Sequence, residues 1–371
     1  MYSMEISVVL PCLNESETLG FCIKKAKNQI KKLNIKGEII VADNGSSDGS
    51  IKIATKLGAH VINVKEKGYG NVLRTGIKKS RGKYILIADS DDSYNLNDLP
   101  KFYNKIKKGY DIVNGCRLPA GGGKIKSGAM PLTHRYIGNP IFSFLTKILY
   151  QIPFNDVYCG MKIIKKEFFN KIHFFSDGMV FCLEILIKAK INKAKMEEIP
   201  ITLFKDGRKI AKSHLKTISD GLKTLKFIMI CSPKLLFFIP SGLFFLSTLI
   251  LSLFNFNFFT DETEKMIFVN FLLIFLSIQF FMLGIYSTLR AKQIEIYKGD
   301  LLNKFFRLFK LRLAIILGLI LIILPGLLNF LNFIYFEDIY NFFYSGLIAL
   351  LGINIIANSF FVSLLEIDGN N

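Results

Sequence analysis

Tryptophan is absent from the 371-residue chain, and its six cysteines show neither CxxC nor zinc-ligand spacing. This spacing excludes the common cysteine-based metal sites. Most of the cysteines lie in apolar or strand-like surroundings, so we expect reduced, structural thiols in a cytosolic setting. The opening stretch Met4–Pro11 is too short for a signal peptide and lacks its positively charged lead, so we expect membrane insertion to depend on later segments.

Acidic residues are scarce relative to basic ones, 29 against 48, which gives a formal net charge of +19. A basic balance favours nucleic acid, an anionic membrane surface or phosphorylated ligands as partners. Apolar residues make up 51% of the chain and are concentrated after about residue 230. That distribution favours the membrane and phosphorylated ligands, and we expect no nucleic-acid partner.

Charge is nearly missing from four apolar runs in the second half, each long enough to span a bilayer as a helix: Leu235–Phe256, Met266–Leu289, Leu313–Tyr335 and Phe342–Leu365. Because these spans carry almost no ionisable residues, they argue against a transport path through the membrane domain. The loop 290–312 is rich in lysine and arginine, whereas the loops 257–265 and 336–341 are acidic. The positive-inside rule then predicts an integral protein of the plasma membrane with its first half and both termini in the cytoplasm.

Two segments alternate apolar and basic residues, Thr217–Lys234 and Leu301–Leu313. Such patterns are typical of helices that lie in the headgroup plane of a membrane, although solvated connector helices are the alternative. We expect membrane lipids as partners, and three regions: a catalytic domain over 1–216, an interfacial helix over 217–234 and a four-helix transmembrane domain over 235–371 with an amphipathic loop 290–312.

The first half alternates predicted strands with predicted helices. The strands are Ile6–Leu10, Glu38–Ala42, His60–Val64, Tyr84–Ala88 and 111–114, and the helices are Glu15–Leu33 with Asn14 as N-cap, Ser50–Leu57, Asn71–Lys79 and 97–107. This order predicts an α/β fold with a parallel sheet covered on both faces. Ligands bind beyond the carboxyl ends of such strands, where Asn14, Glu15, Asp43, Asp89 and Asp91 fall.

The strongest candidate site is Asp89-Ser90-Asp91-Asp92, directly after the apolar run Tyr84–Ala88. Residues two apart share a side of an extended strand, so Asp89 and Asp91 can hold Mg²⁺ or Mn²⁺ together. That ion could bridge the phosphates of a nucleotide-sugar and neutralise the departing diphosphate. Acidic turns between a strand and a helix are also common without any ligand.

Two further segments are candidates for nucleotide contacts. Asp43–Gly49 has the composition of a capped loop before a helix, and Asp43 could accept hydrogen bonds from a base or ribose. Gly68-Tyr69-Gly70 contains half of a phosphate-binding glycine loop but lacks the full GxGxxG pattern. Arg74 could reach a phosphate from the following helix.

These segments, together with Ser7–Glu15, occur in the order and spacing of glycosyltransferase family 2, which the chain resembles. The resemblance extends over about 230 residues to the polyprenyl-phosphate glycosyltransferase branch, which includes dolichol-phosphate mannose and glucose synthases. It rests on Asn114–Arg117, Gly128–Pro131, His134-Arg135, Gly138–Pro140, Asn155-Asp156, Cys159-Gly160, Asp206–Arg208 and Ser213–Leu215. It implies a GT-A (Rossmann-like) nucleotide-sugar domain.

The resemblance also implies roles. Residues lining the nucleotide-sugar pocket would be Pro11, Asn14, Glu15, Asp43, Asp48, Gly68, Arg74 and Asp89. Candidate catalytic residues are Asp89, Asp91, Asp156 and Arg117, with the metal on Asp89 and Asp91. Arg117, Arg135, Arg208 and Ser213 would bind the lipid phosphate, since a guanidinium matches phosphate geometry. Arg135 could instead be a membrane-surface residue, Arg208 a solvated loop charge, and Asp156 either an acid near the reacting centre or a strand-end turn residue.

The absence of tryptophan bears on the type of transfer. Processive polysaccharide synthases of this superfamily hold the growing polysaccharide with a Gln-x-x-Arg-Trp motif. Its absence argues for single-sugar transfer. We therefore predict an inverting, metal-dependent hexosyltransferase that moves one hexose from a UDP- or GDP-sugar to undecaprenyl or dolichyl phosphate. The alternatives are a glycolipid hydroxyl as acceptor, or a catalytically degenerate membrane scaffold or flippase partner. The sequence leaves a homo-oligomer open.

Overall fold

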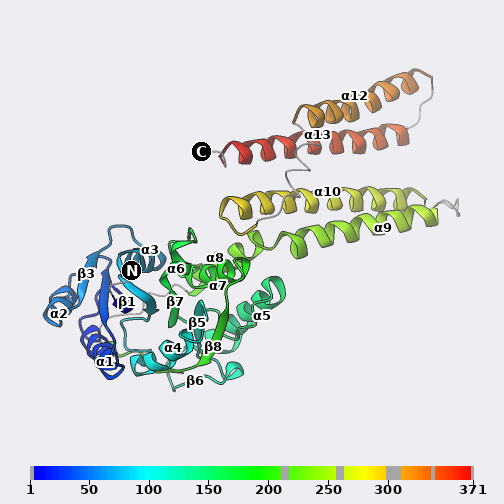
Figure 1. The fold of residues 1–371 in the computed structure, drawn as a ribbon. Coiled ribbons are helices and arrows are strands. Elements are labelled where there is room, and N and C mark those ends of the chain that lie inside the picture. Colours follow the sequence, from blue (N-terminus) through cyan, green and yellow to red (C-terminus); the bar gives the residue numbers. More distant parts are fainter. Residues whose placement is uncertain (1–3, 210–216, 256–262, 298–310, 336–338, 369–371) are drawn as a thin grey trace. The chain divides into compact units, whose positions relative to one another are not determined.

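A computed structural model describes residues 4–209, 217–255, 263–297, 311–335 and 339–368 (Figure 1). The chain divides into two compact units, Met1–Ile228 and Met229–Asn371. Three expectations fall wholly or partly outside the described residues. They are the phosphate role of Ser213, the amphipathic segment Leu301–Leu313, and the charged loops that carry the topology prediction.

The first unit is built on a seven-stranded sheet in the order β3-β2-β1-β4-β7-β5-β8. Its strands are β1 (Met4–Cys12), β2 (Gly37–Asp43), β3 (His60–Asn63), β4 (Gly82–Ile87), β5 (Ile112–Cys116), β7 (Lys162–Lys165) and β8 (Met196–Pro200). The five strands expected from the sequence are all present within a few residues. A separate two-stranded sheet pairs β6 (Lys124–Ile125) with β9 (Thr202–Leu203).

The expectation of a wholly parallel sheet is wrong at β7, which runs antiparallel to both of its neighbours, β4 and β5. The physical reason is the path of the chain between β5 and β7. Gly160, just before β7, lies against Asp89 just after β4. The chain is therefore still at the carboxyl edge when β7 begins, and the strand must run back across the sheet.

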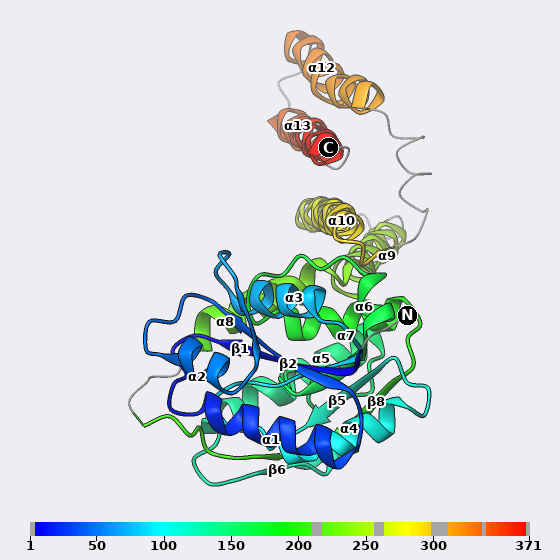
Figure 2. The same cartoon turned by 60° about the vertical axis from the view of Figure 1, so that its left-hand side comes forward.

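Helices cover both faces of this sheet. The helix α1 (Leu19–Lys32) and the helix α4 (Leu99–Ile106) pack on one face, and α3 (Tyr69–Lys79), α6 (Lys166–Asn170) and α7 (Phe181–Ile191) lie on the other (Figure 2). Because side chains alternate along a strand, Val8 of β1 joins the core under α1 while Val9 faces α3. At Gly76 of α3 an added Cβ would lie 2.7 Å from Val9 Cγ1, so this glycine permits close packing of helix on sheet.

The predicted N-cap at Asn14 is wrong, because α1 begins at Leu19 and Thr18 precedes it. Asn14 has a left-handed backbone, with φ of 58°. Its side-chain oxygen accepts the Ser47 N–H at 2.8 Å and its own N–H donates to Ser46 Oγ at 2.9 Å. Asn14 therefore caps the loop after β2 instead of a helix. The short helix α2 (Ser50–Lys56) follows that loop.

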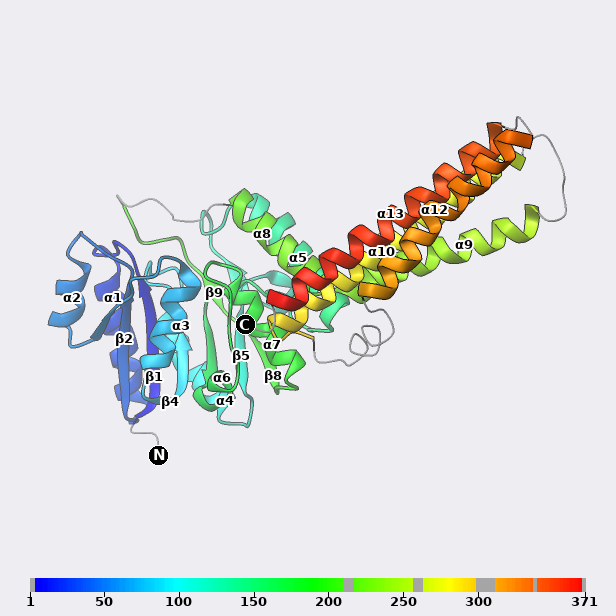
Figure 3. The same cartoon turned by 90° about the horizontal axis from the view of Figure 1, so that it is seen from above.

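Two helices of the first unit carry apolar side chains on their outer surfaces. The helix α5 (Asn139–Tyr150), preceded by a π-helical turn at His134–Gly138, packs beside α8 (Thr217–Ile230) (Figure 3). Tyr150 Oη of α5 donates to the Ile228 carbonyl at 3.1 Å. We use the name α5 stripe for Leu132, which lies two residues before this turn, and the exposed apolar side chains of the turn and of α5: Tyr136, Ile137, Ile141, Phe144 and Ile148.

The second unit is helical, with α9 (Ile239–Asn255), α10 (Thr263–Gln293), α12 (Leu311–Tyr335) and α13 (Ile339–Asp368). By length and composition, Lys234–Leu253 and Phe268–Gln293 are able to cross a membrane, with mean hydropathies of 2.1 and 2.3. In the described parts of α12 and α13 the apolar stretches are shorter, Leu311–Leu327 and Ser345–Phe361. Two of the four expected spans thus have the required length, and the four-helix anchor stays a prediction.

Candidate functional site

The site lies at the carboxyl edge of β1, β2 and β4, where the loops after β1 and β2 are joined by hydrogen bonds. Cys12 at the end of β1 is in register with Asp43 at the end of β2. Beyond them, the two bonds of Asn14 and a bond from the Glu15 N–H to Ser50 Oγ, at 2.9 Å, connect the loops. Pro11 lies at this edge, where its carbonyl accepts a bond from Ser90. The predicted pocket residues of β1 and β2 are therefore brought together.

Two carboxylates of the β2 loop have different surroundings. Asp48 accepts the Ser16 N–H at 2.8 Å and the Ser50 N–H at 3.0 Å. Burial would raise the pKa of Asp48, but these hydrogen bonds outweigh it and hold the pKa at about 2. Asp43 is 1% exposed; its Oδ2 accepts two backbone N–H groups, whereas its Oδ1 is buried and has no partner among the described residues. A buried acceptor without a donor is costly, so Asp43 Oδ1 is a candidate ligand contact.

The glycine segment before α3 is held from two sides. Asn44 accepts the Gly68 N–H at 3.2 Å, and at Gly68, where φ is 120°, an added Cβ would lie 2.3 Å from the Asp177 carbonyl oxygen. Arg74 donates to the Phe174 carbonyl and to Asn71. The structure thus places the Arg74 guanidinium against neighbouring chain, and its contact with a phosphate stays a prediction.

Tyrosine and serine side chains hold one carboxylate oxygen of Asp89 and one of Asp91. Tyr69 donates to Asp89 Oδ1 at 2.7 Å, and the Ser93 N–H and hydroxyl donate to Asp91 Oδ1 at 3.0 and 2.6 Å. Burial and the charge of Asp91 raise the pKa of Asp89 to about 6, although Tyr69 and two arginines oppose the shift. Asp89 Oδ2 has no hydrogen-bond donor in the described part of the chain, so the pair presents excess negative charge to a ligand.

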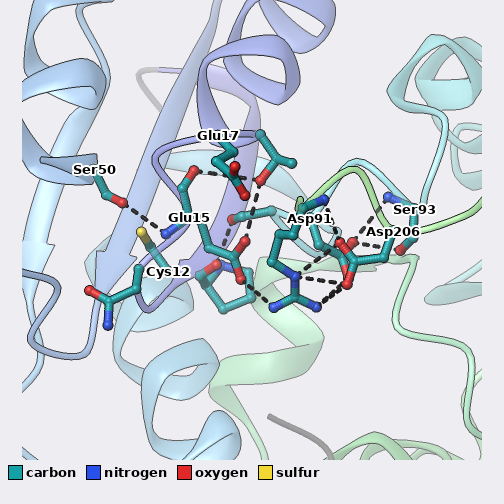
Figure 4. Close-up of polar contacts among 12 residues, drawn as sticks. Cys12, Glu15, Glu17, Ser50, Asp91, Ser93 and Asp206 are labelled. Carbon is teal, nitrogen blue, oxygen red and sulfur yellow. Dashed lines mark hydrogen bonds and ion pairs between the residues drawn. The ribbon is translucent and has the colours of Figure 1, made fainter. Parts of the chain in front are cut away.

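Arg208 lies among three carboxylates that converge on one point, those of Glu15, Asp91 and Asp206 (Figure 4). Its nitrogens are 3.0 Å from Glu15 Oε1 and 3.4 Å from Asp91 Oδ2, and its Nε is 2.7 Å from Asp206 Oδ2. Burial raises the pKa of Glu15 to about 7, partly offset by the charge of Arg208. The Arg208 side chain is 7% exposed, so it is part of this charge cluster and not a solvated loop charge.

Arg117 and Asp156 form a buried ion pair that the sequence did not indicate. Asp156 Oδ2 accepts the backbone N–H and the Nε–H of Arg117 at 2.9 and 2.7 Å, and Oδ1 accepts Nη2 at 2.9 Å. The side chains of Arg117 and Asp156 are 11% and 0% exposed. Asp156 was predicted to be either an acid near the reacting centre or a turn residue. The structure instead shows that its carboxylate orients Arg117.

Arg135, in the turn before α5, has a buried Nε without a hydrogen-bond partner among the described residues. Its neighbour His134 has a pKa lowered by burial and by the charge of Arg117. His134 thus feels the charge of Arg117. Arg208, another of the predicted phosphate-binding arginines, reaches Asp91 from a different loop.

The carboxylates of the site can be compared with the ligands that a divalent metal ion needs. No group of three or more His, Cys, Asp or Glu side chains able to hold a metal ion occurs in the ranges that the structure describes. Mg²⁺ is usually held by one or two carboxylates plus substrate phosphates, not by an all-protein cage. Asp89 and Asp91, whose like charges lie close enough for Asp91 to raise the pKa of Asp89, fit an ion that is shared with a diphosphate.

Sequence reasoning missed Tyr69, Tyr94 and Gly160 as parts of the site. Tyr69 holds Asp89, and Tyr94 accepts hydrogen bonds from the Gly160 N–H at 2.8 Å and from Arg117 Nη1 at 3.3 Å. Tyr69 lies within the Gly68–Gly70 segment and Gly160 within the Cys159-Gly160 motif, and Tyr94 follows Asp91 by three residues. That nearness was the only available signal, because tyrosine and glycine have many structural uses.

The chain is similar in sequence to known glycosyltransferases. Residues 7–173 match the family described as Glycosyl transferase family 2. The low-salt glycan biosynthesis hexosyltransferase Agl6 of Haloferax volcanii is 32% identical over 237 residues, which are 63% of this chain and 55% of that protein. A dolichyl-phosphate hexose transferase of the same organism is 28% identical over 197 residues, which are 53% of this chain and 82% of that protein.

Among solved structures, a glucosyl-3-phosphoglycerate synthase from Mycobacterium tuberculosis, in complex with Mn²⁺ and uridine-diphosphate-glucose, is 19% identical with a TM-score of 0.47. The aligned region covers 61% of this chain and 77% of the synthase chain. A mannosyl-3-phosphoglycerate synthase from Rubrobacter xylanophilus is 21% identical with a TM-score of 0.46, covering 61% and 72%.

Proposed function

Residues 7–173 form a glycosyl transferase family 2 domain, and on this premise we propose that the chain transfers one hexose from a nucleotide-sugar to a polyprenyl phosphate at a membrane surface. The observation that carries the proposal is the arrangement of charged side chains at the carboxyl edge of the sheet. Asp89 and Asp91 offer carboxylate oxygens at one strand end, Arg208 contacts Asp91, and Arg117 contacts Tyr94, three residues after Asp91. Anion-binding and cation-binding groups are thus set side by side.

The donor half of the proposal uses the edge of β1, β2 and β4. Asp43 Oδ1, buried and unpartnered, would accept a hydrogen bond from the base or ribose. Asp89 and Asp91 would share Mg²⁺ or Mn²⁺ with the diphosphate, and the ion would supply charge neutralisation for the leaving group. Asp48 and Asn14 would act indirectly, because their side chains already join the two loops.

The acceptor half uses the arginines. A phosphate oxygen of the lipid attacks the anomeric carbon, the bond from that carbon to the diphosphate breaks, and the nucleoside diphosphate leaves with the electron pair. The acceptor is already anionic at neutral pH, so alignment and charge screening matter more than a general base. Arg117 and Arg135 would receive the phosphate, and Asp156 would keep Arg117 oriented.

A membrane-bound acceptor is consistent with the apolar surface of the first unit. The α5 stripe includes Phe144 at 62% and Tyr136 at 65% exposure, and large exposed apolar groups in a row are typical of interaction surfaces. Two helices of the second unit are able to span a bilayer. We propose a cytoplasmic catalytic domain over 1–216, an interfacial helix over 217–234 and an anchor over 235–371.

The test is a transfer assay with the purified full chain, Mn²⁺, polyprenyl phosphate and labelled UDP- or GDP-hexoses. We expect labelled lipid whose formation requires the metal and is abolished by Asp91→Asn. Glu167→Gln is the matched control, because Glu167 pairs with Lys171 on the surface, where the two side chains are 69% and 67% exposed. Absence of labelled lipid with every donor, from well-folded protein, would refute the proposal.

Two outcomes would point to the alternatives. Transfer to a glycolipid hydroxyl that survives Arg117→Gln would indicate the other acceptor class. Failure of the wild-type chain to bind any nucleoside diphosphate would indicate a degenerate domain with a scaffolding role.

A further inference from the structure

Glu198 of β8 holds the backbone of the segment that carries Asp156. Its Oε1 accepts the Asn155 N–H at 3.0 Å and the Asp156 N–H at 2.9 Å. Its Oε2 accepts the Asn155 N–H and the Asn155 side-chain amide, each at 2.9 Å. One carboxylate thus fixes two consecutive peptide groups and the side chain of Asn155.

The neighbouring strand holds the other end of the same residue. Glu198 of β8 is in register with Asn114 of β5, and the two strands run parallel. Asn114 Nδ2 donates to the Asp156 carbonyl at 2.8 Å. Asp156 is therefore held through its N–H by one strand and through its carbonyl by the next, so the sheet sets the direction in which its side chain leaves the backbone.

The Asp156 carboxylate passes this constraint on to Arg117. It accepts the backbone N–H, the Nε–H and the Nη2–H of Arg117 at 2.9, 2.7 and 2.9 Å. Two parallel bonds between a carboxylate and a guanidinium fix the plane of the guanidinium as well as its position. The orientation of Arg117 therefore depends, through Asp156, on the hydrogen bonds that Glu198 makes.

The contacts of Glu198 are internal to the protein. In the ranges that the structure describes, every hydrogen bond to its carboxylate comes from Asn155 or Asp156. The loop after Arg117 packs tightly against this pair, because a Cβ added at Gly121 would lie 3.1 Å from both Glu198 Oε2 and Asn155 Nδ2. An effect of Glu198 on a substrate would therefore pass through Asp156.

We propose that Glu198 is a positioning residue for the acceptor side of the site: it fixes Asp156 so that Asp156 holds Arg117 in the orientation that receives a phosphate. The proposal rests on the proposed function, in which Arg117 binds the phosphate of the lipid acceptor. It predicts that loss of the Glu198 carboxylate weakens binding of the acceptor and leaves binding of the donor diphosphate unchanged.

The first measurement is calorimetric titration of the full chain with farnesyl phosphate as the acceptor probe and magnesium pyrophosphate as the donor probe. A displacement of about 1 Å in a positioned group can cost on the order of 100-fold. We therefore expect Glu198→Ala to bind farnesyl phosphate roughly 10- to 100-fold more weakly, with its affinity for magnesium pyrophosphate unchanged. Unchanged affinity for farnesyl phosphate, or an equal loss for both probes, would overturn the proposal.

Substitutions at position 198 separate hydrogen bonding from charge. Glu198→Gln keeps an Oε1 that is able to accept both backbone N–H groups. Burial and the charge of Asp156 raise the pKa of Glu198 and so already disfavour its charge, and we expect the amide to restore the affinity for farnesyl phosphate. Glu198→Asp keeps the charge but is one methylene group too short, and it should bind farnesyl phosphate more weakly. Stronger binding by Glu198→Asp than by Glu198→Gln would contradict the proposed role.

The adjacent residue of β8 supplies the matched control. Glu197 points to the opposite face of the sheet, where its carboxylate lies 2.8 Å from Lys105 Nζ and the two side chains are 32% and 30% exposed. Glu197→Ala should leave both affinities unchanged. A loss as large as that of Glu198→Ala would show that any change in β8 disturbs the site, which would refute a specific role of Glu198.

The second measurement needs neither ligand nor turnover. Thermal unfolding compares Glu198→Ala in the wild-type chain with the same substitution in a chain that carries Asp156→Leu and Arg117→Met and so lacks the ion pair. If Glu198 acts through that pair, the two changes are coupled, and the fall in melting temperature should be smaller in the second chain by roughly 1–12 °C. Equal falls would show that Glu198 only supports the loop.

The two measurements separate this proposal from the proposed function. If the wild-type chain binds no farnesyl phosphate, the proposed function fails, while the unfolding comparison still decides whether Glu198 positions Arg117. If the wild-type chain transfers hexose and the two falls in melting temperature are equal, only the role of Glu198 fails.

Discussion

The ion pair between Arg117 and Asp156 gives a quantitative prediction for stability. Asp156→Ala would remove three hydrogen bonds to Arg117 and leave a guanidinium with 11% exposure unpaired. Breaking a buried pair by removing one partner costs about 3–5 kcal/mol. For a unit of this size each kcal/mol shifts the melting temperature by about 2–4 °C, so we expect a fall of roughly 6–20 °C.

The backbone around Asp156 is held independently of its carboxylate, which makes the substitution specific. Glu198 accepts the Asp156 N–H at 2.9 Å, and Asn114 donates to the Asp156 carbonyl at 2.8 Å. These bonds persist when the side chain is shortened. The change therefore reports on the carboxylate and not on the loop.

The assay is thermal unfolding followed by circular dichroism at one fixed scan rate, with the full chain in detergent. Glu167→Ala is the control, because an exposed pair is worth about 0–1 kcal/mol. The double substitution Asp156→Leu with Arg117→Met should recover much of the loss, since it leaves no buried charge unpaired. A fall no larger than that of Glu167→Ala, or a double variant less stable than Asp156→Ala, would refute the reasoning.

Two further predictions use other features of the first unit. Because the chain has no tryptophan, Phe144→Trp introduces a single reporter into the α5 stripe, and brominated lipids should quench its fluorescence in vesicles. Phe21→Trp, at a residue that is 61% exposed against 62% for Phe144, should stay unquenched, and equal quenching of both would contradict an inserted stripe. For Glu15, the folded-state pKa of about 7 lies above the ordinary 4.5, so its contribution to stability is fully present below about pH 4.5 and is lost as the pH rises to about 7. Glu15→Gln should therefore gain in melting temperature relative to wild type between pH 5 and pH 8, and a pH-independent difference would argue against the raised pKa.

The sequence predicted the elements of the α/β unit that local patterns determine. Short β-branched runs predicted β1 to β5, and the position of Asp89 and Asp91 after an apolar run placed them at the carboxyl edge. The strand β7 was not predicted, because its position depends on where the chain returns after α5, and no local pattern records that path. The same applies to Asn14, whose hydrogen bonds to Ser46 and Ser47 are made across two loops.

The polar contacts of the site were less predictable than its location. A guanidinium can pair with any nearby carboxylate, and which one it meets depends on loops that are far apart in the sequence. Arg117 was predicted as a phosphate ligand without its partner Asp156. Conversely, Arg74 looked available for a phosphate, yet the structure engages it with the Phe174 carbonyl.

The contacts of Arg208 link the two halves of the proposed reaction. Its bonds to Asp206 and Glu15 are 3.0 Å or shorter, whereas its contact with Asp91 Oδ2 is 3.4 Å. The Asp91 contact is therefore the weakest and the first to be replaced. A cation bound to Asp91 would compete for that same oxygen and repel the guanidinium, which frees the Nη2 of Arg208 for an anion. If the proposed reaction is right, binding of a metal-bound diphosphate and the availability of Arg208 for a phosphate would be coupled through one carboxylate oxygen.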